Sequence, residues 1–179
     1  MARLDRDAVL RGGLALADEA GLAAVTLRRL ADKLGVTPMA LYRHVAGKDD
    51  LLVGMADLLY AELDVPEPTG DWWEELAALA RSTRRVLLAH PAAAPLFSRP
   101  LSGPSSLRLG DALLGTLRRA GFYPAEAEEL HDQLSSMVFA LVAPELHPGP
   151  QRGRRARDAA FERGIELLHA GLLARLGQQ

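Results

Sequence analysis

Apolar residues recur at helical spacing along nearly the whole 179-residue chain, and no segment alternates apolar and polar residues as a half-buried strand would. Glycine and proline interrupt this pattern most clearly at 64–70, 98–106 and 147–155. Hydrophobic residues make up 49% of the chain, which is enough for a packed core rather than a disordered protein. The sequence therefore predicts an all-α protein.

The N-terminal 47 residues predict three helices. The first covers residues 6–20, and Thr26 then caps a short amphipathic helix that ends at Gly35. A Thr-Pro pair opens the third helix, predicted over about 37–45, because proline fits the first position of a helix. Two short helices joined by a tight turn and preceded by a longer helix are typical of a helix-turn-helix unit.

The third helix needs only Leu41 and Val45 for its buried face, so its other side chains are free to face DNA in the major groove. Arg28, at the start of the second helix, can reach a guanine edge. Thr26 and Lys48 lie at helix N-termini, where phosphate binding is favourable. The predicted DNA-binding residues are Thr26, Arg28, Thr37, Pro38, Met39, Tyr42, Arg43, His44 and Lys48. A solvated helical hairpin is the alternative explanation for the same residues.

The segment TLRRLADKLGVTPMALYRHVAGKDDLL, residues 26–52, resembles the DNA-binding signature of TetR-family transcriptional regulators. The shared features are a Thr-capped helix, a Gly-Val turn, a Leu-Tyr-x-His-Val core, and a lysine followed by two leucines. The later part of the chain is more loosely similar to the regulatory domain of the tetracycline repressor class, in RRVLLAHP, then GP, then a helix ending in AGF. The resemblance implies an all-helical homodimer with a helix-turn-helix DNA-binding domain over 1–47. A helical ligand-binding and dimerisation domain would follow over 48–179.

That resemblance also implies the function and the role of each residue. The chain is expected to be a transcriptional repressor that binds a palindromic, double-stranded operator and is released by an unidentified small-molecule effector. A cytoplasmic location is expected separately, because the sequence suggests neither a signal peptide nor a membrane span. Base contacts are expected from Arg28, Thr37, Pro38, Met39, Tyr42 and Arg43, and phosphate contacts from Thr26, His44 and Lys48, while Tyr42 fits either role. The position of the family's ligand-binding histidine is occupied here by Asp64, so a tetracycline–magnesium site is not expected, and no cofactor or metal is predicted.

The last helix, predicted over about 157–176, has two usable faces. One is a bulky apolar stripe, and the other consists mostly of small residues. An interior glycine costs about 1 kcal/mol relative to alanine, so Gly164 and Gly171 predict the close approach of another helix. The predicted dimer interface comprises Met137, Leu141, Gly164, Leu167, Gly171 and Ala174. An ordinary core helix with incidental glycines is the alternative.

An effector pocket is predicted between the helices of the C-terminal domain, since such sites are usually apolar with a few polar groups. The candidate residues are Leu59, Phe97, Leu113, Leu117, His131, Leu134, Ser135 and Val138. Plain core packing is the alternative for each of them.

Other classes of protein find little support. The chain has no cysteine and no run of eighteen apolar residues, which argues against disulfides, thiolate metal sites and a membrane partner. No two-histidine zinc motif or nucleophile motif supports an enzyme, and His131-Asp132 with Glu128 and Glu129 lacks further spaced ligands for a metal.

The net charge is −2, with +1 in residues 1–50, so DNA binding must depend on local placement of charge. The basic run at 152–155 is expected to be a charged loop, with a second nucleic-acid contact as the alternative. The alternative function is a helical small-molecule-binding or scaffold protein without specific DNA binding.

Overall fold

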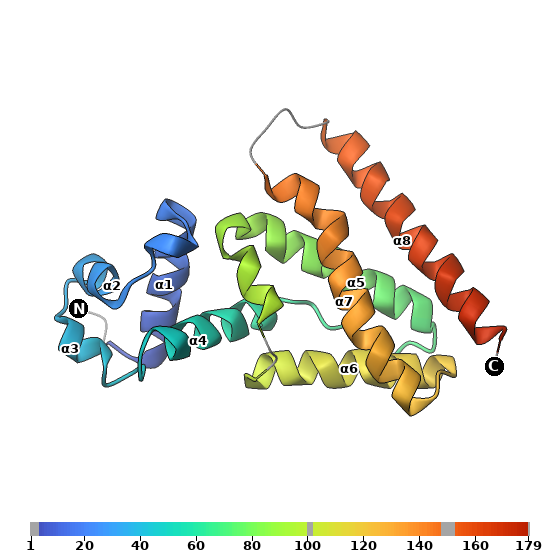
Figure 1. Ribbon diagram of the computed structural model, residues 1–179, viewed down its shortest axis with the longest axis horizontal. Coiled ribbons are helices and arrows are strands. Elements are labelled where there is room, and N and C mark those ends of the chain that lie inside the picture. Colours follow the sequence, from blue (N-terminus) through green and yellow to red (C-terminus); the bar gives the residue numbers. More distant parts are fainter. Residues whose placement is uncertain (1–3, 100–101, 148–152, 179) are drawn as a thin grey trace. The chain divides into compact units, whose positions relative to one another are not determined.

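The computed structural model describes residues 4–99, 102–147 and 153–178, and every element formed by these residues is a helix. The all-α prediction is thereby confirmed. In chain order the elements, with η denoting short 3₁₀ helices, are α1 (Arg6–Ala20), η1 (Leu22–Ala24), α2 (Leu27–Leu34), α3 (Pro38–Leu41), α4 (Lys48–Ala61), α5 (Trp72–Ala89), η2 (Pro91–Ser98), α6 (Pro104–Ala120), α7 (Pro124–Leu146) and α8 (Arg154–Leu176) (Figure 1).

Local sequence accounts for the ends of the short helices. The Thr26 hydroxyl accepts a hydrogen bond from the Arg29 N–H at 3.2 Å, and Thr37 accepts one from the Ala40 N–H at 3.3 Å. Both threonines are the predicted N-caps, which satisfy N–H groups that a helix leaves unpaired at its start. Gly35 ends α2 in the left-handed region with φ of 66°, as glycine at a helix C-terminus commonly does.

Three helix boundaries differ from the prediction. The third helix was expected to reach residue 45, but α3 ends at Leu41 and the chain continues as a turn through His44. The turn is tight because the Leu41 carbonyl accepts hydrogen bonds from the N–H groups of both His44 and Val45. α6 begins at Pro104, three residues before Leu107, where the sequence pattern predicts its start. α8 also starts early, at Arg154, so the expected charged loop is wrong for 154–155, which are helical, whereas Arg152 lies outside the described residues.

The chain divides into two compact units. One comprises Met1–Glu62 with Ala89–Leu107, and the other comprises Leu63–Leu88 with Arg108–Gln179. The first unit therefore contains α4 and η2 together with the predicted DNA-binding helices, and the division falls within α6, after its first turn. This grouping by packing differs from the functional boundary predicted after residue 47, because α4 packs against α1 and η2.

The core of the first unit is built around fully buried leucines on α2, α3 and α4. These leucines are among the largest side chains that are fully buried. α4 also packs closely on α1, since a Cβ at Gly54 of α4 would lie 2.5 Å from the Leu10 side chain. Within the same unit, Asp57 of α4 accepts hydrogen bonds from the N–H groups of Ser105 and Ser106 at 2.9 and 3.0 Å. A carboxylate on α4 thus caps the N-terminus of α6, where an acceptor and a negative charge are both favourable.

The core of the second unit joins α5, α6, α7 and α8. Its buried residues are Leu76, Leu79, Leu113, Leu117, Phe122, Ala127, Leu130 and Leu172. At its edge the His169 ring stacks on Trp73, with ring centroids 4.1 Å apart and an interplanar angle of 3°. α7 and α8, the orange and red helices of Figure 1, run side by side and contact each other.

Among the described residues, no helix combines the length and the apolar character needed to cross a bilayer.

Candidate nucleic-acid interface

The turn of α3 has one buried face and one exposed face. Leu41 and Val45 are 0% and 2% exposed, whereas Met39 and Tyr42 are 70% and 53% exposed. Thr37, Pro38 and Arg43 are exposed as well, and His44 is half-buried. Large side chains that remain this exposed beside a basic residue are compatible with a binding surface. The exposed set matches the residues predicted from the sequence to face DNA.

Three predicted contacts flank α3. Arg28 is exposed in the first turn of α2, and Lys48 is exposed as the first residue of α4. The Thr26 side-chain oxygen accepts the N-cap bond of α2, which leaves its hydroxyl proton free to donate to a phosphate oxygen. Each of these residues therefore stands at a helix N-terminus, the end that carries positive dipole charge and favours anions.

The turn between α3 and α4 is held by an interaction that was not predicted from the sequence. The Asp50 carboxylate accepts hydrogen bonds from the Ala46 N–H at 2.8 Å and from the Arg6 guanidinium at 2.6 and 3.0 Å. Arg6 also donates to the His44 carbonyl at 2.5 Å. The hydrogen bonds from Arg6, and then from Ala46, lower the pKa of Asp50 to about 2. No local sequence pattern predicts this pair, because Arg6 and Asp50 are 44 residues apart.

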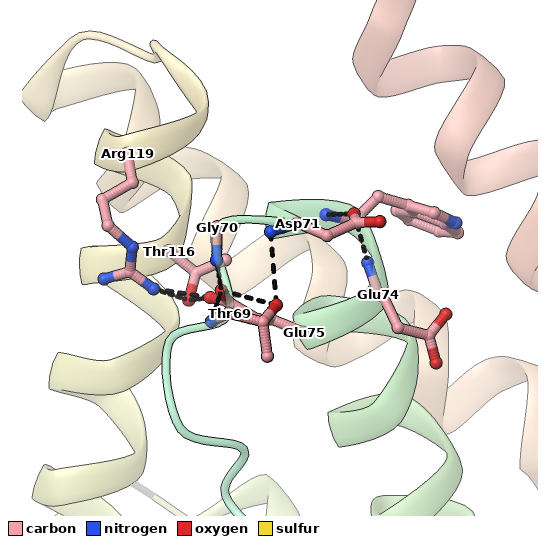
Figure 2. Close-up of polar contacts among 8 residues, drawn as sticks. Thr69, Gly70, Asp71, Glu74, Glu75, Thr116 and Arg119 are labelled. Carbon is pink, nitrogen blue, oxygen red and sulfur yellow. Dashed lines mark hydrogen bonds and ion pairs between the residues drawn. The ribbon is translucent and has the colours of Figure 1, made fainter.

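A second carboxylate holds the loop before α5 in the other compact unit. Glu75 is almost fully buried and accepts hydrogen bonds from the N–H groups of Thr69 and Gly70 at 2.7 and 3.2 Å (Figure 2). It also accepts bonds from Thr116 and Arg119 of α6, at 3.0 and 2.5 Å. Burial raises the pKa of Glu75, but the hydrogen bonds outweigh burial and lower it to about 2. The ionised carboxylate thus joins the start of α5 to the end of α6.

Two family models match the chain. Residues 9–55 match the bacterial regulatory proteins of the tetR family, and residues 65–163 match the tetracyclin repressor-like C-terminal domain. The chain belongs to the TetR family. It is a DNA-binding transcriptional regulator and not an enzyme, in agreement with the prediction from its helix-turn-helix motif.

The chain is also similar to individual proteins, two of which have solved structures. An HTH-type transcriptional regulator of Saccharopolyspora erythraea is 35% identical over 97% of this chain and 86% of its own. The TetR family protein ActR of Streptomyces coelicolor, solved in complex with (S)-DNPA, has a TM-score of 0.83 and 30% identity, over 97% of this chain and 98% of its own. BioQ, solved with its natural double-stranded DNA operator, has a TM-score of 0.79 and 28% identity, over 96% and 99% of the two chains.

The predicted dimer residues of this TetR-family regulator fall into two groups. Met137 and Leu167 are 46% and 75% exposed, and Gly171 and Ala174 are also exposed. Gly164 is buried instead, and a Cβ there would collide with the Leu141 side chain of the same chain. The close approach predicted at Gly164 therefore occurs within one protomer, between α7 and α8, which the interior glycine alone could not distinguish from a subunit contact.

The predicted effector residues are distributed over both compact units. Leu113, Leu117 and Leu134 belong to the apolar core of the second unit or pack against it. The His131 ring contacts Asp132 at 3.0 Å, Val138 is half-buried, and the exposed Ser135 donates its hydroxyl proton to the His131 carbonyl. Leu59 and Phe97 belong to the first unit, where Phe97 contacts Tyr60 with ring centroids 4.9 Å apart. Burial raises the pKa of Tyr60 to about 12.

The structure shows no metal site at the acidic and histidine residues singled out in the sequence, all of which it describes. Across the residues that the structure describes, no group of three or more histidine, aspartate or glutamate side chains is arranged to hold a metal ion. Asp64 lies beyond the end of α4, and its carboxylate pairs with Arg85 at 2.9 Å.

Proposed function

We propose that this regulator represses transcription by binding a palindromic operator as a homodimer, and that it leaves the operator when a small molecule binds its C-terminal domain. The observation that carries the proposal is the exposed face of α3, where Met39 and Tyr42 project beside Arg43 while Leu41 and Val45 anchor the opposite face. We infer that it acts in the cytoplasm, on double-stranded operator DNA.

The residue roles follow from chemistry and position. Arg28 reads a guanine through a bidentate pair of hydrogen bonds. Thr37, Pro38, Met39, Tyr42 and Arg43 face base edges in the major groove, while Thr26, His44 and Lys48 contact phosphates. BioQ, which is similar over nearly its whole length, was solved with its double-stranded DNA operator, and this supports operator binding by the present chain.

Dimerisation uses the exposed apolar face of α7 and α8. Met137 of α7 and Leu167 of α8 are exposed apolar side chains, which are costly to leave in water. The small residues Gly171 and Ala174 leave room on α8 for another helix to approach. Leu141 and Gly164 support this face from within the protomer. Sedimentation at micromolar concentration tests the assembly, and a monomer under those conditions contradicts it.

The C-terminal domain, proposed to begin at residue 48, binds the effector. ActR was solved in complex with (S)-DNPA, which supports ligand binding by a protein of this fold. A hundredfold loss of operator affinity requires the effector to prefer the released form by only about 2.7 kcal/mol. Thermodynamic linkage requires that operator DNA weaken effector binding by the same factor. Equal affinity of a confirmed effector for the free and the DNA-bound protein would contradict release by this route.

The DNA-binding assignment is tested by selecting a duplex from a random pool with the wild-type protein and then measuring variants on it. We expect Arg28→Ala to cost about 1–3 kcal/mol and to relax specificity at one base pair. Lys48→Ala should weaken binding to all sequences alike and reduce the salt dependence by about one phosphate. Arg11→Ala, which removes the same charge from α1, is the control and should bind as the wild type does. Failure of the wild type to select any sequence would instead favour a helical ligand-binding protein without specific DNA binding.

A further inference from the structure

We propose that Arg6 and Asp50 are positioning residues for operator binding, which hold the turn at 42–47 in its DNA-binding shape without contacting DNA themselves. We refer to these two side chains, with their bonds to His44 and Ala46, as the Arg6–Asp50 clasp. This inference rests on the proposed DNA-binding surface, since it concerns how that surface is held.

The turn needs support from outside its own sequence. α3 has only four residues, far fewer than a helix needs to be stable alone. Burial of Leu41 and Val45 fixes one face of the turn but leaves the chain between Val45 and α4 without an apolar anchor, since Ala46 is exposed. That short connection sets the distance and angle between α3 and the N-terminus of α4, where Lys48 begins the helix.

The clasp supplies the missing support at both sides of this connection. Asp50, from the first turn of α4, accepts the Ala46 N–H, and Arg6, from the first turn of α1, donates to the His44 carbonyl. Arg6 and Asp50 then join each other through two parallel hydrogen bonds at 2.6 and 3.0 Å. Such a two-pronged arginine–carboxylate pair fixes orientation as well as distance. Three elements, α1, the turn and α4, are thus held in one geometry.

The negative charge of Asp50 makes the proposal testable, because removing this charge can either strengthen or weaken operator binding. A carboxylate beside Lys48 repels DNA phosphate, so simple electrostatics predicts that removing its charge strengthens operator binding. If Asp50 positions the turn, removing its charge must instead weaken binding. The two explanations therefore predict opposite changes in the same measurement.

The experiment measures operator affinity over a range of salt concentrations, using fluorescence anisotropy and the duplex selected by the wild-type protein. Circular dichroism and thermal unfolding establish that each variant is folded. We expect Asp50→Asn to weaken binding about tenfold, the order expected when a charge-assisted hydrogen bond that holds a loop is lost. Its salt dependence should match that of the wild type, because no phosphate contact is removed. Asp7→Asn is the matched control: it removes the same charge from the Asp7–Arg11 pair of α1, also 2.6 Å long, and should not weaken binding.

Variants of Arg6 test the other half of the clasp and keep the proposal falsifiable if Asp50→Asn fails to fold. Arg6→Lys retains the charge but loses the paired geometry, so we expect it to weaken binding. The double variant Arg6→Gln/Asp50→Asn should bind no more weakly than the weaker single variant. Wild-type affinity for Arg6→Lys, with a salt dependence reduced by about one phosphate in Arg6→Gln, would show that Arg6 contacts DNA and would overturn the proposal.

Failure of the clasp and failure of the proposed function give different results. If the wild type selects no duplex, the proposed function fails. If the wild type binds and Lys48→Ala weakens binding, while Asp50→Asn binds as tightly as the wild type or more tightly, only the clasp is refuted.

Discussion

Asp50 in the first compact unit and Glu75 in the second do the same chemical task in different surroundings. Each carboxylate accepts backbone N–H groups from the segment before its own helix and pairs with an arginine from another helix. The side chain of Asp50 is 32% exposed, whereas that of Glu75 is 2% exposed. An exposed pair competes with water and contributes little to stability, but a buried acceptor that is removed leaves its donors without water to replace it. We therefore expect Asp50 mainly to fix the geometry of the turn before α4, and Glu75 mainly to stabilise the folded state.

The largest expected effect is the loss of stability in Glu75→Ala. The change leaves the N–H groups of Thr69 and Gly70 and the Thr116 hydroxyl without their acceptor, so we expect the free energy of unfolding to fall by about 3–5 kcal/mol. Urea unfolding at one fixed protein concentration measures it, because dimerisation makes stability depend on concentration. Glu74→Ala, at an exposed neighbour that pairs with Arg81, is the control and should cost less than about 1 kcal/mol. Equal losses in the two variants would break the contrast between buried and exposed carboxylates.

The contribution of Glu75 to the free energy of unfolding should depend on pH, because folding lowers its pKa. The folded-state pKa is about 2 and the ordinary value is 4.5, so Glu75 stabilises the folded state fully above pH 4.5 and loses this contribution as the pH falls toward 2. The difference corresponds to about 3 kcal/mol. We expect the unfolding free energy of Glu75→Gln to depend less steeply on pH than that of the wild type over this range. Parallel curves for the two proteins would contradict the contribution assigned to the ionised carboxylate.

The smallest expected effect is the loss of stability in Asp50→Asn. Since its arginine partner is 47% exposed, the pair should contribute less than about 1 kcal/mol to the free energy of unfolding. The same urea experiment measures this change alongside Glu75→Ala. A loss as large as that at Glu75 would mean that Asp50 serves the fold as a whole, and a weaker operator complex would then not identify a positioning role.

The exposed face of α3 could be predicted almost completely from the sequence, whereas the surroundings of the predicted effector residues could not. The interface is a contiguous motif, and its exposed set followed from two apolar anchors, Leu41 and Val45, on a short helix. The effector candidates come from several helices, and whether Leu113 or Ser135 faces a cavity, the core or solvent depends on how those helices pack. Leu113 is in the core and Ser135 is exposed.

The amino-acid sequence by itself determined the N-caps of α2 and α3, because those interactions join residues three positions apart. Thr26 bonding to Arg29 and Thr37 bonding to Ala40 are of this kind. The tertiary structure alone decided the contacts between distant segments, such as Arg6 with Asp50, Glu75 with Thr116, and Leu141 against Gly164. Arginine and glutamate are also common on solvated helices, and an interior glycine does not show which helix approaches it. Their roles arise only when packing brings a donor, an acceptor or a facing side chain within reach, and no pattern along the chain encodes that distance.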